Sequence, residues 1–284
     1  MMNANGFSKI MIKNNKMKWV QSMTRPLMGA SLAVMLSACA NMAADTDHGL
    51  CDLKLLSLQI PKETQSLMRS AHSSQVEVFK HDQQKFNQAL EAVQKKYANR
   101  DGMNSMLADG QAINANIDLL VKHHADLDAL YEYSLLVGET IPGIQAEYNL
   151  MVDMMARKNA SAMEVVIAKN QVFVADRMLR SMDRMFDLDS HQSDTVDDFL
   201  ADFNIFNLYL NAQLNGSAEL GVGRVKDAEL RESLLSIKAG IDDLNQSDSL
   251  ALLQKKEPMV SVLKAARDNM IKSDQIFNAL QKLE

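Results

Sequence analysis

The chain has 284 residues, of which 47% are hydrophobic and 5% aromatic, and its formal net charge is −6 at pH 7. The first 38 residues hold five Lys or Arg side chains and no Asp or Glu, so the rest of the chain has 25 basic and 36 acidic residues and a charge of −11. Because so acidic a chain is repelled by phosphates, we expect no nucleic-acid partner and no basic membrane-binding patch.

A secretory signal peptide is predicted over residues 1–38. Basic residues, the last of them Arg25, precede an apolar run from Leu27 to Leu36, and small residues follow it. The apolar run is too short to cross a bilayer as a stable helix. Its end, Leu36-Ser37-Ala38-Cys39, resembles the bacterial lipobox, in which the cysteine after the cleavage site is acylated.

This resemblance implies that Cys39 is the lipidation site and that the lipid tethers the protein to a membrane through residues 39–49. Several acyl chains together give stable anchoring, whereas one chain alone is marginal. Ala40 follows the cysteine, which in such lipoproteins indicates the outer membrane, so we expect a protein that faces the periplasm. The alternative is an ordinary secretory signal with a cysteine near its cut. If Cys39 is acylated, Cys51 is expected to be a free thiol.

The remainder of the chain is predicted to be all-α, because apolar residues recur at spacings of three and four and strand-like alternation is missing. The predicted core positions are Phe79, Phe86, Leu90, Val93 and Tyr97; Ile113, Ile117, Leu120, His124 and Leu127; Ile141, Ile144, Tyr148, Met151 and Met155; Phe199, Phe203, Phe206 and Leu210; Leu230, Leu234, Ile237, Ile241 and Leu244; and Leu263, Ala266, Met270, Phe277 and Leu280. Such seams are typical of long antiparallel helices that pack at small crossing angles.

Turns are predicted between these helices, at residues 99–102, 158–160, 187–193, 215–216 and 245–249. Short connections of this kind favour antiparallel neighbours. Pro142 is expected to kink its helix or to restart it, with Thr140 as the N-cap of the restarted helix.

A faint repeat suggests two copies of one helical module. The pattern of basic and Phe-bearing helices over residues 62–93 returns over 169–210. We therefore predict a first module over residues 50–158 and a second over residues 160–284. The helices form either one rod or two stacked four-helix-bundle-like modules.

Two segments carry a resemblance to a known family. The first begins Glu139-Thr140-Ile141-Pro142 and continues to Tyr148, and the second runs from Ile167 to Ser181 and carries two arginines. Both resemble the PilJ-type sensory domain, the periplasmic part of type IV pilus chemoreceptors, which also occurs in nitrate/nitrite sensor kinases. The likeness extends loosely over residues 52–284 and implies an all-α antiparallel bundle.

The resemblance implies a sensory or binding function. In the family the domain lies between membrane helices and drives a cytoplasmic signalling domain, and neither is recognised here. We therefore expect binding, delivery or scaffolding in a pilus, chemosensory or envelope system, with a partner protein or as a homodimer. The alternative is an accessory solute-binding protein for a small anion such as nitrate. No catalytic motif is recognised, so we expect neither an enzyme nor a cofactor.

Arg177 and Arg180 lie three residues apart on one predicted helix, and Lys169 and Asn170 precede them by two turns. Planar guanidinium groups can hold a small anion with paired donors, so these four residues are the candidate ligand site. The resemblance adds Arg69, because nitrate-sensing members carry an arginine in the corresponding helix of the first module.

The alternative interpretation of these arginines is structural. Nearby acids, Asp176 and Asp183 among them, are available to form salt bridges in so acidic a protein. His124, on an apolar stripe, is expected to be a hydrogen-bonded core residue, since no metal-ligand spacing accompanies it. We therefore predict no metal site.

Overall fold

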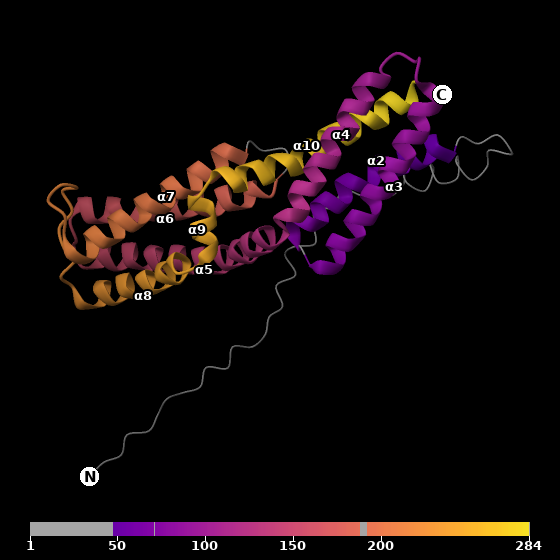
Figure 1. Ribbon diagram of the computed structural model, residues 1–284. Helices are drawn as coiled ribbons and strands as arrows, with labels where there is room; N and C mark the ends of the chain where they lie inside the picture. The colour runs from indigo at the N-terminus through magenta and orange to yellow at the C-terminus, as the bar shows by residue number, and fades with distance from the viewer. Residues whose placement is uncertain (1–47, 71, 188–191, 284) are drawn as a thin grey trace, which may run out of the picture. The chain divides into compact units, whose positions relative to one another are not determined.

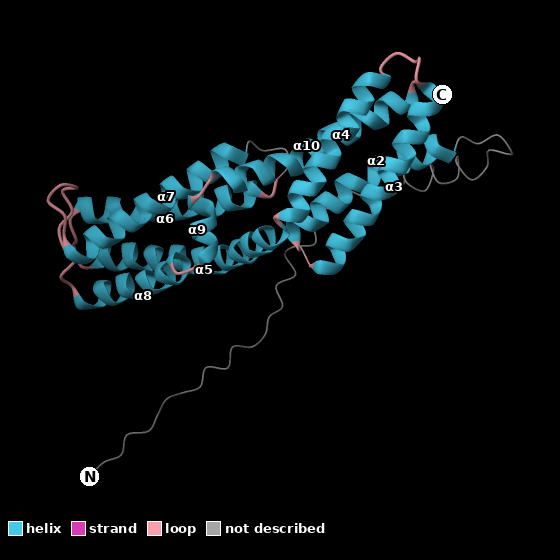
Figure 2. Ribbon diagram, viewed as in Figure 1, coloured by secondary structure: helices cyan, strands magenta, loops and turns pink. Residues whose placement is uncertain are grey.

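The computed structural model describes residues 48–70, 72–187 and 192–283. The predicted signal peptide and Cys39 lie outside these residues. The described residues form nine helices and no strand, apart from one isolated bridge between Ser217 and Val222 (Figure 2). The all-α prediction is confirmed.

The helices follow one another through short connections. In chain order they are α2 (His48–Arg69), α3 (Ser73–Tyr97), α4 (Met103–Lys122), α5 (His124–Arg157), α6 (Ala162–Met185), α7 (Gln192–Asn215), α8 (Ala228–Asn245), α9 (Asp248–Gln254) and α10 (Glu257–Gln281). The predicted turns at 99–102, 158–160, 215–216 and 245–249 all fall at connections between helices. Helix α2 begins two residues inside the predicted tether.

The helices close two rings of four (Figure 1). In one ring α2, α3, α4 and α10 each contact the next helix, and α10 contacts α2; in the other, α5, α6, α7 and α8 do the same. The short α9 connects α8 to α10. Helix α10 completes the first ring although it follows the helices of the second ring in the sequence. Helices that precede residue 159 and helices that follow it therefore pack together in the same ring. The division into modules 50–158 and 160–284 stays a prediction.

The predicted stripes face the core, with one change of register. The five positions from Leu230 to Leu244 are buried, as are the four from Phe199 to Leu210. In α10, however, Asn269, Ser273 and Ile276 are fully buried, whereas Met270 and Phe277 are only partly buried, so the predicted core positions Met270 and Phe277 were wrong. Asn269 has a buried hydrogen-bond partner on the inner face, the Thr64 hydroxyl of α2, which makes that position suitable for its side chain.

Pro142 does not restart a helix, contrary to the prediction that Thr140 could act as an N-cap. Helix α5 runs without interruption from His124 to Arg157. Proline removes the amide that would bond to the carbonyl four residues earlier. That carbonyl belongs to Gly138, which is exposed, so water can satisfy it and the helix continues.

The break between α4 and α5 was not predicted. Helix α4 ends at Lys122 and α5 begins at His124, with His123 between them at φ −104° and ψ 20°. The His123 ring donates Nδ1–H to Asp126 at 2.8 Å, and His124 donates Nδ1–H to the Val121 carbonyl at 2.9 Å. The apolar stripe through His124 therefore spans two helices, and His124 is hydrogen-bonded, as expected.

Cys51 lies in the first turn of α2 and is disulfide-bonded, contrary to the expected free thiol. That expectation depended on acylation of Cys39, because a thioether sulfur cannot form a disulfide. Cys39, the other cysteine of the chain, lies outside the described residues. None of the described helices combines the length and the hydrophobicity needed to cross a membrane.

The register of α5 predicts the effect of an inserted charge. Ile141 is fully buried, so Ile141→Asp places an unpaired carboxylate in the core and is expected to lower the free energy of unfolding by about 3 kcal/mol or more. Leu150→Asp on the same helix is the control, because Leu150 is largely exposed. Urea unfolding followed by circular dichroism measures both, and equal losses would show that the register is wrong.

Candidate binding face on helices α6 and α7

Helices α6 and α7 run antiparallel, which two contacts establish. Arg177 of α6 lies opposite Asp202 of α7, and Gln171 donates its side-chain amide to the Phe206 carbonyl at 2.9 Å. Moving back along α6 therefore corresponds to moving forward along α7. The start of α6 is fixed by a capping box, in which Ser161 and Glu164 bond to each other's backbone amides.

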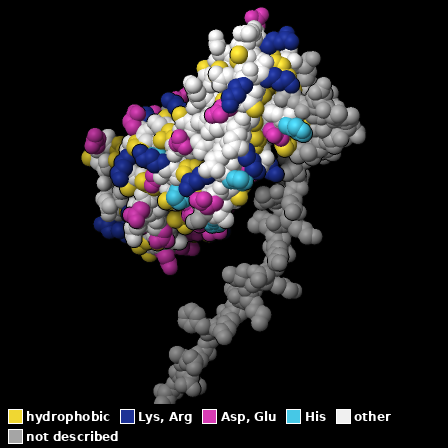
Figure 3. Space-filling view, turned by 45° about the vertical axis from the view of Figure 1, so that its right-hand side comes forward, with side chains coloured by type: hydrophobic (Ala, Val, Ile, Leu, Met, Phe, Trp, Pro, Cys, Tyr) yellow, Lys and Arg dark blue, Asp and Glu magenta, His cyan; other side chains and the backbone are white. Residues whose placement is uncertain are grey.

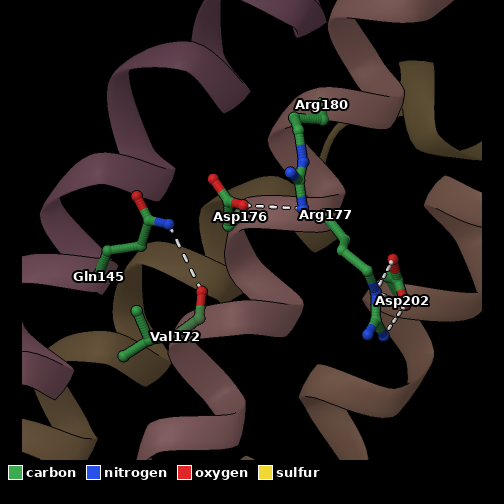
Figure 4. Close-up of polar contacts among 6 residues, drawn as sticks. All are labelled: Gln145, Val172, Asp176, Arg177, Arg180 and Asp202. Atoms are coloured by element: carbon green, nitrogen blue, oxygen red, sulfur yellow. Dashed lines mark hydrogen bonds and ion pairs between the residues drawn. The ribbon is translucent and has the colours of Figure 1, made fainter.

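Arg177 is held by a carboxylate of the neighbouring helix. Its Nε donates to Asp202 Oδ2 at 3.0 Å and its Nη2 donates to Oδ1 at 2.5 Å, which is the paired geometry shown in Figure 4. The Asp202 side chain is 10% exposed, and the bond to it raises the pKa of the Arg177 guanidinium. The guanidinium face that could have held an anion therefore already holds a carboxylate.

Arg180 is also paired, although more loosely. Its Nη2 lies 2.9 Å from Asp176 Oδ2, one turn earlier on α6, and both side chains are substantially exposed (Figure 4). An exposed pair of this kind contributes about 0–1 kcal/mol. Arg177 and Arg180 are therefore both paired with carboxylates, as the structural interpretation predicts, and Asp176 is one of the two acids that the sequence suggested as partners.

The other predicted site residues are not gathered around these arginines. Asn170 lines a cavity together with Arg177, but Lys169 lines neither of the two cavities that Arg177 shares. Arg69 is the last residue of α2, in the other ring of helices, and lines neither cavity. The structure thus joins Asn170, Arg177 and Arg180 and leaves Lys169 and Arg69 apart.

Two open cavities meet at Arg177. One, of about 630 Å³, is lined by Arg180, Arg184, Asp183 and Asp198 among others; the second, of about 460 Å³, is mostly apolar. We call the surface that carries both cavities the α6–α7 face. It is defined by Met163, Val166, Asn170, Phe173, Arg177, Arg180 and Arg184 of α6 and by Asp198, Asp202, Ile205, Leu208 and Tyr209 of α7.

Charge is balanced in the first of these cavities. Three arginines face Asp183, Asp198 and Asp202, so the cavity does not favour an anion by net charge. Desolvation by the surrounding protein raises the pKa of Asp183. Basic and acidic side chains are likewise interspersed on the surface seen in Figure 3.

Large apolar side chains are exposed at the other end of this face. Met163, Val166 and Phe173 of α6 and Ile205 and Leu208 of α7 are each between 40% and 65% exposed. The sequence contained a signal for this feature that we did not use. Residues 163, 166, 170, 173 and 177 follow a spacing of three and four, a second stripe on the side of α6 away from its core stripe.

A buried polar cluster joins three helices beneath this face. The Tyr148 hydroxyl of α5 donates to Gln213 Oε1 of α7 at 2.8 Å, and Gln171 of α6 lies 3.5 Å from the same hydroxyl. All three side chains are at most 2% exposed, and burial raises the pKa of Tyr148. Gln145 adds a bond from α5 to the Val172 carbonyl of α6 (Figure 4). The two segments that carry the family resemblance thus meet in the core.

The fold is a helical bundle of the kind that the resemblance implied, and comparison with known proteins finds similarity to two curated proteins. No protein-family model matches the chain. It is similar to a protein of Alcanivorax borkumensis described as putative methyl-accepting chemotaxis AlkN, with 24% identity over 251 residues, which are 88% of this chain and 36% of that protein. It is also similar to Protein PilJ of Pseudomonas aeruginosa, with 25% identity over 162 residues, which are 55% of this chain and 24% of that protein.

These similarities confirm the predicted likeness to a PilJ-type sensory domain. The matched part amounts to about a third of the AlkN protein and a quarter of PilJ. The activities and partners of the whole relatives therefore do not transfer to this chain by similarity alone.

The buried cluster predicts a cost for a very small change. Tyr148→Phe removes the hydroxyl that donates to Gln213 and leaves a buried oxygen without its donor, so we expect a loss of about 1–3 kcal/mol of unfolding free energy. Tyr131→Phe is the control, because the Tyr131 ring packs edge-on against Phe186 and its hydroxyl makes no hydrogen bond with another described residue. Urea unfolding measures both, and equal costs would contradict the prediction.

The paired arginines predict weak binding of small anions. Nitrate, sulfate, phosphate and simple carboxylates are expected to leave the melting temperature unchanged beyond a common salt effect, since a ligand of the folded state raises stability by mass action. The Arg177→Ala/Arg180→Ala variant leaves Asp202 without its cation, so its melting temperature is expected to differ from that of the wild type even without anions. Each anion is therefore judged by the shift it causes relative to the same protein without anion. A shift with nitrate in the wild type that the variant loses would restore the anion site.

Proposed function

We propose that the chain is a lipid-anchored, periplasm-facing binding protein whose PilJ-like sensory domain contacts a partner protein in a pilus, chemosensory or envelope system. The observation that carries the proposal is the similarity to a putative chemotaxis protein over 88% of this chain. Similarity to Protein PilJ of Pseudomonas aeruginosa supports it. No enzymatic step enters the proposal.

The α6–α7 face supports a protein partner better than a small anion. Arg177 and Arg180 are already paired, so an anion would have to displace Asp202 and Asp176. The apolar cavity next to them is open, and its rim carries Phe173. A broad surface with an apolar part and a charged part is typical of a protein interface. Solute capture, with nitrate as the example, is the weaker alternative.

Anchoring through Cys39 follows from the lipobox-like sequence alone. In this proposal the anchor holds the domain at the outer membrane, on the periplasmic side, where a sensory bundle would meet envelope proteins. The disulfide at Cys51 competes with this assignment if Cys39 is its partner, because one sulfur cannot carry both bonds. Acylation and thiol state must therefore be determined on the same purified protein.

Cys39→Ser is expected to abolish acyl labelling and membrane fractionation, because the thiol that would be acylated is gone. Labelling with an alkyne fatty acid and mass spectrometry of the N-terminal peptide measure the lipid. Cys51→Ser is the matched control and is expected to keep both. Unchanged labelling of Cys39→Ser, or an intact Cys39–Cys51 disulfide in the membrane-bound protein, would contradict the anchor.

The sensory assignment is tested in the cell. Deletion of the gene is expected to change pilus-dependent surface motility or chemotaxis, and the wild-type gene should restore it. Complementation with Cys39→Ser separates the need for an anchor from the need for the domain. Unaltered motility and chemotaxis in the deletion strain would count against the proposed function.

A further inference from the structure

The apolar cavity of the α6–α7 face has the features of a small-molecule site, and we propose that it binds an uncharged linear amphiphile, a molecule with a hydrocarbon chain and one hydroxyl or carboxamide group. Its volume of about 460 Å³ falls within the range of ligand pockets, about 300–1,000 Å³. The inference goes beyond the proposed function, because it gives the domain a ligand of its own in addition to a partner protein.

Three segments of the chain line the cavity, so it is a hollow and not a flat patch. Helix α6 contributes Phe173, helix α7 contributes Ile205, and the loop that follows α7 contributes Leu220. Leu220 and Val222 of this loop pack in a small apolar cluster with Ile167 of α6, which also lines the cavity. The walls are therefore held in place by the fold itself, as is usual for small-molecule sites.

Most of the lining is hydrocarbon, and it is elongated along α6. The apolar positions run from Met163 to Val174, eleven residues or about 16 Å at 1.5 Å per residue. Met163, Val166 and Phe173 are each at least half exposed, so a hydrocarbon chain laid against them would remove their apolar surface from water. A long, narrow apolar surface fits a linear chain better than a compact molecule.

A buried acceptor in the lining selects a ligand that also carries a hydrogen-bond donor. Gln171 lines the cavity and is 1% exposed, and its Nε2 donates to the Phe206 carbonyl at 2.9 Å. Because a carbonyl can only accept, this bond fixes which atom of the Gln171 amide is the nitrogen, and Oε1 takes the other position. No described residue donates to Oε1. A buried acceptor without a donor is costly, and the O–H or N–H of a ligand would satisfy it.

Two further polar groups lie at nearly the same height. Gln171 lies opposite Phe206, so in the antiparallel pair Asn170 lies within one turn of the height of Tyr209. Both side chains line the cavity, and neither the Asn170 amide nor the Tyr209 hydroxyl makes a hydrogen bond with another described residue. Together with Gln171 they offer donors and acceptors to one polar group of a ligand, with apolar surface on both sides.

The charges at the cavity favour an uncharged ligand. Among the described residues of the lining, Arg177 is the one with a permanent charge, and two hydrogen bonds pair it with Asp202. A carboxylate would lose its hydration and would meet a guanidinium that is already neutralised, and an ammonium group would be repelled by Arg177. A hydroxyl or a carboxamide avoids both costs.

A series of straight-chain amides tests the inference by calorimetric titration. The protein is the predicted mature chain, residues 39–284, made without the signal peptide and the lipid, so that no detergent competes for the probes. From hexanamide through heptanamide to octanamide, each added methylene is expected to tighten binding by up to about fourfold. Octanoate and octylamine have the same chain length but are charged at pH 7, and each is expected to bind at least about tenfold more weakly than octanamide.

Methyl NMR of the methionine side chains locates the bound amide. Octanamide is expected to shift the signal of Met163, which lines the cavity, and to leave that of Met106, buried in α4, unchanged.

Three substitutions test the residues of the site. Phe173→Asp places a charge in the apolar wall at a side chain that is 65% exposed, so the fold is expected to be retained and octanamide to bind about tenfold or more weakly. Leu208→Asp is the matched control, because Leu208 is 51% exposed on α7 and does not line the cavity. Tyr209→Phe removes only a hydroxyl and is expected to weaken octanamide about fivefold.

Failure of all amides to bind, an affinity that does not depend on chain length, or Phe173→Asp binding as tightly as the wild type would overturn the inference. Octanoate binding as tightly as octanamide would also overturn it and would assign the cavity to fatty-acid anions. These results are separate from the deletion phenotype. A chain that binds no amide but whose deletion alters motility or chemotaxis would lose the ligand and keep the proposed function, and a chain that binds octanamide without a deletion phenotype would do the reverse.

Discussion

The first ring of helices depends on α10, which arrives from the far end of the sequence. Asn269 of α10 donates to the Thr64 hydroxyl of α2 at 3.3 Å, and both side chains are fully buried although 205 residues separate them. Lys272 reaches Asp109 of α4 at 3.0 Å. Without α10 the helices α2, α3 and α4 would leave their inner faces in water, so the second ring must be traversed before the first can close. This is why residues 48–284 form one compact unit.

The same constraint explains which parts of the fold the sequence could predict. Spacings of three and four reveal a helix and its apolar side from local residues alone, and most stripes were assigned correctly. Asn269 and Ser273 look like surface residues in such a pattern, and only the distant Thr64 makes an inner position suitable for Asn269. The break at His123 was also hidden, because the apolar spacing continues across it while a single residue changes the backbone direction.

In the candidate site, too, contacts within one helix could be predicted from the sequence, whereas contacts between helices could not. The sequence places Arg177 and Arg180 on one side of a helix and offers Asp176 as a partner within one turn. It does not reveal Asp202, since that contact requires α7 to fold back along α6 in one particular register. That register also gives two donors of the Arg177 guanidinium to Asp202 instead of to an anion. The numbers of basic and acidic residues alone do not distinguish an anion-binding arginine from one that is paired with a carboxylate.

The two sides of helix α6 differ in burial. Its inner side holds Gln171, which meets Tyr148 from the other family-like segment in a buried cluster, so the likeness to PilJ-type domains describes how the core is built. Its outer side holds Val166, Phe173 and Arg184, which contribute little to that core and are exposed. Substitutions on the outer side therefore cost the fold little. The outer side of α6 can therefore vary without a change of fold, and it is the side on which the proposed partner would bind.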